Sequence, residues 1–221
     1  MFSPQQIGAL GASFIKSSPW NSVSTYSASL KFYFTVSSSY CVHKLKLLFW
    51  PFNHRSFAPR RRIVQDQRFS PSEDINAPDF YIGFVSLLFC VLTVAISCFT
   101  ATLSNSSAPS FSKYVWKVFW SLFFAVIIKK SIFAVFPTSF PSPSLFDLVA
   151  YFSYSFPFTA LLRFCSLWFP LIITIPMLIY SVICYCYYIF YTSKALVPDS
   201  TNYYSISFSI LGALLILITW S

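Results

Sequence analysis

The chain has 221 residues, of which 56% are apolar, 21% aromatic and only 10% charged. Its mean hydropathy is +0.64, and it holds 27 Phe against 4 Gly. A water-soluble domain of this size has no interior large enough for so many apolar side chains, which excludes a soluble globular protein. The formal net charge of +9 comes from 15 Lys and Arg against 6 Asp and Glu, and no acidic residue precedes Asp66.

Five apolar runs predict an all-α polytopic membrane protein with about five transmembrane helices. The first run has 24 residues without a charge, which as a helix measures about 36 Å and crosses a bilayer. The second apolar run, from Tyr114 to Phe136, carries three lysines, so four spans is the alternative. The predicted spans cover approximately residues 80–103, 112–136, 145–163, 168–191 and 203–220.

Among the charged side chains within these runs or at their ends, four are weighed as functional candidates: Lys129, Lys130, Asp147 and Arg163. We expect the two lysines to extend to the headgroup region, and Asp147 and Arg163 to mark the two ends of the third span. A charged group inside a membrane is otherwise a candidate for function. An ion or proton path through these four residues is therefore the alternative.

The distribution of basic residues predicts the orientation, because Lys and Arg accumulate on the cytosolic side of membrane proteins. With five spans and a cytosolic N-terminus, twelve basic residues lie on the cytosolic side and three on the other. We therefore expect a cytosolic N-terminus and a lumenal C-terminus. Asn105-Ser106-Ser107 is then a lumenal N-glycosylation sequence, but it lies so close to the first span that we expect a plain polar turn.

Composition divides the chain into a Ser-rich segment over residues 1–30, a basic arm over residues 31–79 and an apolar remainder over residues 80–221. We expect the first segment to be a disordered cytosolic tail, because it lacks the apolar content needed to order itself. The second segment is expected to be a cytosolic arm close to the membrane. The third is the predicted transmembrane helical domain.

The arm begins with KFYFTVSSSYCVHKLKLLFWPF over residues 31–52, in which Val42, Leu45 and Phe49 recur at helical spacing. A short amphipathic helix on the membrane surface is one interpretation of this pattern. A segment folded against the ends of the spans is the other, and the sequence does not separate the two.

A basic cluster follows in the arm, formed by Arg60, Arg61 and Arg62. Anionic lipid attracts such a cluster by roughly 1 kcal/mol per basic residue, so these residues are candidates for contact with the lipid surface. A signal that sets the topology is the simpler interpretation. No nucleic-acid-binding motif accompanies the cluster, so we expect no nucleic acid as a partner.

The string SEDINAPDFYIGF leads into the first span. The side-chain oxygen of Asn76 or Asp79 can accept a hydrogen bond from a free amide at the helix start, and Asp79 also faces the positive end of the helix dipole. Pro78 suits a first helical turn, where its missing amide hydrogen is not needed. Structural capping is the preferred interpretation, and recognition of a partner through Asp74, Asn76, Pro78, Asp79 and Tyr81 is the alternative.

These segments occur together in one known family. The aromatic KFYF start, the Lys- and Leu-rich stretch, FWPF with the nearby His54, and the Asp-x-Asn-x-Pro-Asp-x-Tyr-Ile string over residues 74–82 follow one another in family order. From about Lys31 to Trp220 the chain resembles the Yip-interacting-factor (YIF) family of early secretory pathway membrane proteins, within the superfamily of Rab-interacting Yip proteins.

A second match is LFDLVAYFSYSF over residues 145–156, which is similar to the family's third-span opening, Leu-Leu-Ala-Tyr-Ser-Gly-Tyr-Lys. Three residues depart from the family pattern. Gly83 stands where the family often has Pro, Ser153 replaces the glycine of the third-span motif and Ser155 replaces its lysine. Serine is small enough to allow close approach of helices at that point.

The resemblance implies a multispanning protein of the Golgi and endoplasmic reticulum membranes, with its N-terminal arm in the cytosol. It implies a hetero-oligomer with a Yip-family membrane protein, and contacts from the arm to Rab GTPases or vesicle coat components. The expected function is that of a membrane adaptor in vesicle-mediated protein transport from the endoplasmic reticulum to the Golgi.

The sequence contains none of the usual patterns of catalytic or metal sites. No GxGxxG or GxxxxGK[ST] motif occurs, and His43 and His54 are too isolated for a HExxH site or a catalytic triad. The six cysteines form no CxxC pair and lie mostly in apolar runs, where they pack as small apolar side chains. We therefore expect no enzymatic activity, no cofactor and no metal.

Two other functions fit parts of the sequence. The acid-free, Ser-rich and basic N-terminus suits a mitochondrial import sequence and an inner-membrane protein, but the first 54 residues contain no arginine. A small membrane transporter that uses the charged ends of the spans is the other alternative.

Overall fold

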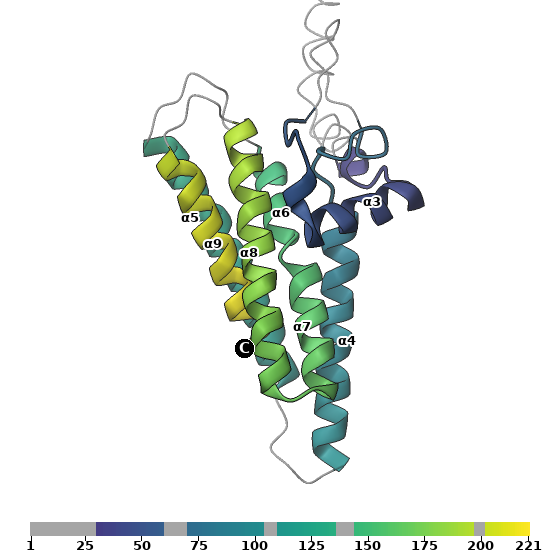
Figure 1. The fold of residues 1–221 in the computed structure, drawn as a ribbon. Helices are drawn as coiled ribbons and strands as arrows, with labels where there is room; N and C mark the ends of the chain where they lie inside the picture. The colour runs from purple at the N-terminus through teal and green to yellow at the C-terminus, as the bar shows by residue number, and fades with distance from the viewer. Residues whose placement is uncertain (1–29, 60–69, 104–109, 136–143, 197–201) are drawn as a thin grey trace, which may run out of the picture.

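The computed structural model describes residues 30–59, 70–103, 110–135, 144–196 and 202–221. Within these ranges the chain is helical and has no β-strand, which confirms the predicted all-α class. Figure 1 shows long helices side by side, with a short helix across one end. Three predicted features lie outside the described residues: the tail over residues 1–30 apart from Leu30, the cluster Arg60, Arg61 and Arg62, and the glycosylation sequence that begins at Asn105.

Five helical segments of the described chain are long and apolar enough to cross a membrane, which confirms the prediction of five spans over four. They are α4 (Tyr81–Leu103), α5 (Phe111–Val135), the pair α6 (Leu145–Ser153) and α7 (Phe156–Trp168), α8 (Leu171–Leu196) and α9 (Asn202–Trp220). Large apolar side chains stay exposed along their outer faces, among them Leu92, Phe99, Trp168 and Ile172. Such faces require a lipid environment.

The third span differs from the prediction. It continues to Trp168, beyond the expected end at Arg163, and a turn at Tyr154 and Ser155 interrupts it. Pro157 has no amide hydrogen to donate to the carbonyl of Ser153, so an uninterrupted helix would lack a hydrogen bond there. This span is also the most buried one, because α4, α8 and α9 all pack against α7.

The core of the bundle is formed by aromatic side chains from the last three spans. The rings of Phe152 and Phe208 stack with centroids 4.9 Å apart, and Phe158 meets Tyr185 edge to face at 5.9 Å. Helix α8 packs along α9, where Gly212 leaves room for the ring of Tyr185. These contacts hold the spans that face the arm in fixed positions.

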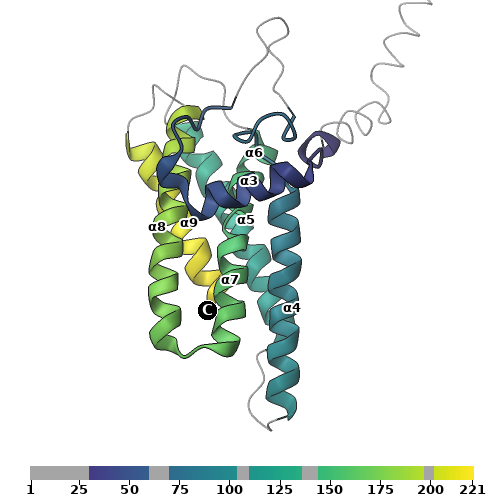
Figure 2. The same ribbon diagram turned by 45° about the vertical axis from the view of Figure 1, so that its right-hand side comes forward.

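The arm lies across the end of the bundle at which α4 and α6 begin (Figures 1 and 2). It contains α3 (Ser38–Phe49) and the short 3-10 helix η1 (Pro51–Asn53), which both contact α8. Residues 31–52 are therefore folded against the ends of the spans, as the second interpretation of their sequence proposed.

The inward face of α3 differs from the predicted one. Val42 is 67% exposed, whereas the side chains of Tyr40, Lys44, Leu47 and Leu48 are buried. The prediction followed apolar spacing alone, so the predicted apolar positions were Val42, Leu45 and Phe49 and did not include Lys44. A buried lysine was not expected, because an ammonium group is stable away from water only where polar partners surround it.

Candidate functional site

A buried polar cluster joins the arm to the bundle at Asp79, whose side chain is inaccessible to solvent. Asp79 Oδ2 accepts hydrogen bonds from the hydroxyls of Tyr40 at 2.7 Å and Tyr154 at 2.6 Å. The amide of Asp79 in turn donates to the Tyr154 hydroxyl at 2.8 Å. One residue thus connects α3, the start of α4 and the turn between α6 and α7.

Asp79 also caps α4, because its Oδ1 accepts from the amide of Ile82 at 2.9 Å. This confirms one of the two predicted caps. Pro78 precedes the cap and is buried, so its predicted place in the first helical turn is wrong. The helix begins at Tyr81, whose side chain is 40% exposed.

Lys44 places a buried ammonium group beside Asp79. Its Nζ donates to the carbonyl oxygens of Ile75 at 2.5 Å and Ala77 at 3.2 Å. The same Nζ lies 4.9 Å from the ring centroid of Tyr154 and 5.7 Å from that of Tyr188, within the range of cation–π attraction. We call Tyr40, Lys44, Asp79, Tyr154 and Tyr188 the Asp79 cluster.

Burial dominates the electrostatics of the cluster on the arm side. It lowers the pKa of Lys44 from 10.5 to about 8, although Asp79 and Asp74 pull that pKa upward. Burial also raises the pKa of Tyr40 far above its ordinary value, and the carboxylate of Asp79 adds to the rise. Tyr40 therefore stays protonated and keeps donating to Asp79 at physiological pH.

Asn76 shapes the loop that leads to the cluster. Its Nδ2 donates to the carbonyls of Ser56 at 2.8 Å and Ala58 at 3.1 Å, and its Oδ1 lies 3.0 Å from His54 Nε2. Its amide donates to Asp74 Oδ1 at 3.1 Å. Asn76 therefore joins two parts of the arm and does not cap α4, which was the other predicted cap.

The motif residues of this segment thus point inward. Asp74, Asn76 and Asp79 are exposed by 4%, 8% and 0%, so none of them presents a free side chain to a large partner. What they determine is the shape of the arm and its position on the bundle.

Tyr33 forms a second anchor, where α6 begins. Its hydroxyl donates to Asp147 Oδ1 at 2.8 Å, and its ring centroid lies 4.8 Å from that of Phe80. Asp147 also belongs to a capping box with Ser144 at the start of α6. Asp147 therefore marks the start of the third span, as predicted, and it holds the arm there.

A third anchor fixes the end of α3 against α8. The hydroxyl of Tyr180 donates to the carbonyl of Phe49 at 2.7 Å, which satisfies an acceptor that the helix end leaves unpaired. Phe57, further along the arm, stacks on Tyr191 with centroids 5.6 Å apart. The arm is thus attached at both ends of α3 and at the Asp79 cluster between them.

Lys129 does not extend to the headgroups, so the prediction for this residue is wrong. It is fully buried between α5 and α9, where its Nζ donates to the carbonyl of Tyr204 at 2.8 Å and to Ser207 Oγ at 3.1 Å. The Nζ also lies 3.3 Å from the ring centroid of Tyr204. These partners replace water around the ammonium group. Lys130, its neighbour, is half-buried.

Arg163 lies inside the third span rather than at its end. Its Nε donates to the carbonyl of Thr219 at 3.0 Å, and its guanidinium carbon lies 4.3 Å from the ring centroid of Tyr114. The carbonyls at the C-terminal end of α9 favour a cation. The span can therefore continue past Arg163, the residue at which it was expected to end.

The described residues contain no group of three or more His, Cys, Asp or Glu side chains placed to hold a metal ion. All six cysteines are free, and Cys90, Cys165 and Cys184 are buried, as their apolar surroundings predicted. The polar side-chain atoms of Tyr40, Lys44, Asp79 and Tyr154 are engaged with one another and with backbone groups, whereas the buried hydroxyl of Tyr188 has no hydrogen-bond partner among the described residues. The arrangement is suited to holding two parts of the chain together.

Asp79 could be predicted from the sequence, whereas its partners Tyr40, Lys44 and Tyr154 could not. One signal was present: Tyr40 and Lys44 stand four residues apart, which places them on one face of α3. Tyr154 lies in the second family-like motif, at the position of the Tyr that follows the motif's glycine. The pairing of the two motifs requires tertiary structure.

Comparison with known proteins matches residues 5–210 to the family model YIF1. Protein YIF1A of Danio rerio is 28% identical over 145 residues, which cover 63% of this chain and 44% of the relative. Protein transport protein YIF1 of Saccharomyces cerevisiae is 30% identical over 128 residues, covering 56% of this chain and 39% of the relative. Protein YIF1B of Homo sapiens is 37% identical over 68 residues, covering 31% and 21%.

The matched part thus spans less than half the length of each of these relatives. No solved structure matches the chain. The family model, in contrast, covers the whole arm, the first four spans and the first half of the fifth. The chain belongs to the YIF1 family.

Proposed function

We propose that this protein is a non-enzymatic membrane adaptor in vesicle-mediated transport between the endoplasmic reticulum and the Golgi. Its family supports a role in membrane traffic, since the relatives in Saccharomyces cerevisiae and Schizosaccharomyces pombe are named protein transport proteins. The observation that carries the proposal is the contact between Asp79 and Tyr154. It joins the two segments by which the chain resembles its family, and it holds a cytosolic arm in one position on a membrane bundle.

The arm is the proposed binding surface for Rab GTPases or coat components. Its outer side carries a polar hollow of about 310 Å³, lined in part by Ser39, His43 and Glu73. A surface with one fixed shape binds with a smaller loss of conformational entropy than a flexible segment does. The cluster beneath the arm thus supports binding by fixing the shape of this surface, and one of its members, Tyr40, also lines the hollow.

The spans are the proposed contact with a Yip-family membrane protein. Their outer faces combine small and large apolar side chains, which pack well against another transmembrane helix. Helix α5, for example, exposes an aromatic stripe that includes Trp116, Trp120 and Phe123.

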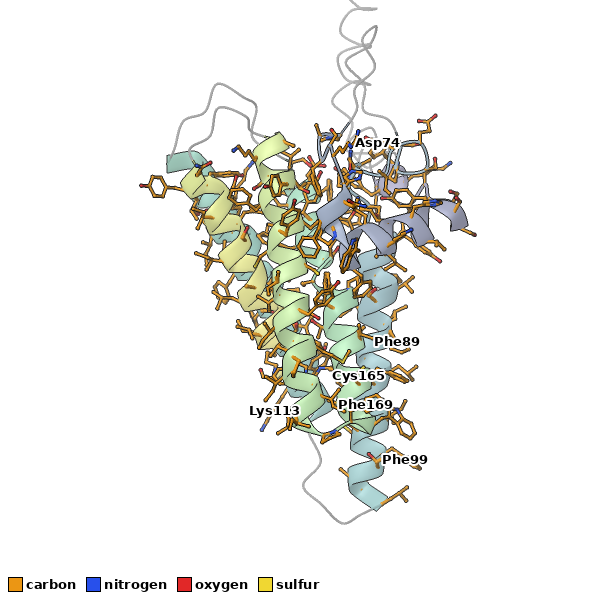
Figure 3. The ribbon with its side chains drawn as sticks, in the orientation of Figure 1. Asp74, Phe89, Phe99, Lys113, Cys165 and Phe169 are labelled. Atoms are coloured by element: carbon orange, nitrogen blue, oxygen red, sulfur yellow. The ribbon has the colours of Figure 1, made fainter. Side chains whose placement is uncertain are left out.

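The proposed orientation places the arm in the cytosol. Lys31, Lys46, Arg55 and Lys194 belong to the arm or to span ends beside it. Figure 3 shows Lys113 and Phe169 at the end of the bundle opposite to Asp74. The larger number of basic residues at the arm's end supports this orientation.

Transport of a solute is the weaker alternative, because the charged residues of the spans lie at separate contacts. Lys129 lies between α5 and α9, Arg163 binds the far end of α9, and Asp147 begins α6 beneath Tyr33. Each is engaged with protein atoms. A proton path would require them to be linked to one another.

The experiment is to express a tagged copy, determine its compartment and identify the proteins that copurify in mild detergent. We expect Golgi and endoplasmic reticulum membranes and a Yip-family protein. Asp79→Ala should lose copurifying Rab or coat proteins while keeping the membrane partner, because it frees the arm and leaves the spans intact. Tyr203→Phe, at a side chain of α9 that is 80% exposed and belongs to neither the cluster nor the hollow, is the control and should keep both sets of partners. Location in the mitochondrial inner membrane, or solute flux that depends on Lys129, would contradict the proposal.

A further inference from the structure

An apolar groove of about 420 Å³ runs beside the arm, between α4 and α6. Its wall on α4 is formed by Phe80, Gly83, Phe84 and Leu87. Spacings of three and four residues place these positions on one face of the helix, over a length of roughly 10 Å. Because the stripe starts where the first span starts, the groove runs from the membrane boundary into the hydrocarbon region.

The opposite wall consists of Phe146, Val149, Ser153 and Phe156. Ser153 is the one residue with a polar side chain among those that line the groove, and its hydroxyl donates to the carbonyl of Ala150 at 2.7 Å. The groove therefore offers no free hydrogen-bond donor. An apolar chain without polar atoms fits such a lining.

The arm closes the groove at the membrane boundary. Leu30 and Phe34 line that end, and the ring of Phe34 lies 5.9 Å from that of Phe80. Tyr33 holds this part of the arm in place through Asp147. The groove between α8 and α9, in contrast, is lined by those two helices alone and has no such closure.

A basic residue adjoins the closed end in the sequence. Lys31 is exposed and stands between Leu30 and Phe34, the two arm residues that line the groove. Near the membrane boundary, an ammonium group attracts the phosphate of an anionic lipid.

We propose that this groove holds one acyl chain of an anionic phospholipid, whose headgroup is bound by Lys31. The ligand is a lipid chain rather than a partner's helix because of size. A helix 10–12 Å wide displaces more than about 1,000 Å³ over ten residues, well above the volume of the groove. The proposal requires that the chain spans a membrane, and it does not depend on any protein partner.

The groove couples the lipid to the arm, because Leu30 and Phe34 contact both. By linkage, a lipid that binds the closed groove stabilises the docked arm, and a docked arm increases the affinity for that lipid. The same chain would thus present its cytosolic surface more firmly in membranes rich in anionic lipid.

The test uses the full chain in phosphatidylcholine nanodiscs that contain a small fraction of phosphatidylserine with a diazirine on one acyl chain. After irradiation, labelled peptides are mapped by mass spectrometry. We expect the label to concentrate on the residues that line the groove. Val149→Trp, which fills the groove, should reduce that label at least fivefold, whereas Ala213→Trp, in the groove between α8 and α9, should leave it unchanged.

Lys31→Glu keeps the proposal testable if Val149→Trp fails to fold, because Lys31 is exposed. It should reduce labelling by the phosphatidylserine probe at least threefold and leave labelling by the matching phosphatidylcholine probe unchanged. Label spread evenly over the outer faces of all spans would overturn the proposal. So would equal labelling by the two probes in the unmodified chain, or an unaltered yield in both variants.

Discussion

Gly83 on α4 and Ser153 at the end of α6 lie so close together that a Cβ at position 83 would overlap the side chain of Ser153. These are two of the positions at which the chain departs from the pattern of its family. A residue without a side chain on one helix thus faces a residue larger than glycine on the other. Serine was expected to permit close approach here, and it does so because position 83 is glycine.

Gly83→Ala should therefore destabilise the protein by about 1–3 kcal/mol, the usual effect of excess volume in a packed interior. Ser153→Gly in the same chain should restore most of this loss. The free energies of unfolding of the two single variants and the double variant, measured in detergent, give the coupling energy of the pair. Additive effects would show that the two residues do not share one space.

Tyr154→Phe should destabilise the protein by about 1.5–3 kcal/mol, because it removes a donor from a buried carboxylate and an acceptor from the amide of Asp79. Thermal unfolding in detergent measures the effect. Tyr203→Phe is the matched control, since Tyr203 is 80% exposed, and it should unfold like the unmodified chain. Equal stability of the Tyr154→Phe variant would exclude Asp79 as the main link between arm and bundle.

The docking of the arm should become more favourable as the pH rises from 8 to 10. In this range the docked Lys44, with a pKa of about 8, loses its proton, while the released side chain keeps it up to 10.5. The released state thus binds more protons, and the free energy of release increases with pH, by about 2 kcal/mol. Hydrogen exchange of the α3 amides across this range measures it.

Two neighbours act in the opposite direction, since burial raises the pKa of Cys41 and of Tyr40. When the arm is released, both side chains lose their protons at a lower pH than they do in the docked arm. This favours release of the arm above about pH 9 through Cys41 and above about pH 10 through Tyr40. The measurement therefore uses a Cys41→Ala chain and compares it with the same chain carrying Lys44→Met. The increase in the free energy of release between pH 8 and pH 10 must disappear with Lys44→Met. If the increase persists, a group other than Lys44 is responsible.

Lys129→Met should leave the stability unchanged or increase it, because it replaces a buried charge by an apolar side chain of similar length. Lys129→Ala should decrease it by several kcal/mol, since it leaves a cavity between α5 and α9. Thermal unfolding of both variants distinguishes packing from charge. A large loss of stability in the methionine variant would show that the ammonium group itself holds the two helices together.

The sequence predicted the spans well because transmembrane helices are specified by local hydropathy. The third span was the main exception, and the fourth was also displaced, since α8 runs from Leu171 to Leu196 against the predicted 168–191. Arg163 was taken as its end, yet Thr219 and Tyr114, which are distant in the sequence, provide the contacts that admit a cation within the span. The turn at Tyr154 could have been anticipated from Pro157.

The candidate site was predicted only in part. Asp79 follows from local rules, since a carboxylate before an apolar run is a common helix cap. Tyr40 and Lys44 do not, because apolar spacing assigns a lysine to the outer face of α3. Lys44 is buried because two carbonyls and two aromatic rings come from other parts of the chain. Only their positions in the folded protein bring them together.

Hydrogen–deuterium exchange on the full chain in nanodiscs tests most directly whether the arm is docked through Asp79. The amides of α3 should be protected in the unmodified chain and should exchange at least tenfold faster in an Asp79→Asn, Tyr154→Phe double variant, while those of α8 stay protected. Unprotected amides in α3 of the unmodified chain, or exchange there that the double variant leaves unchanged, would contradict the account.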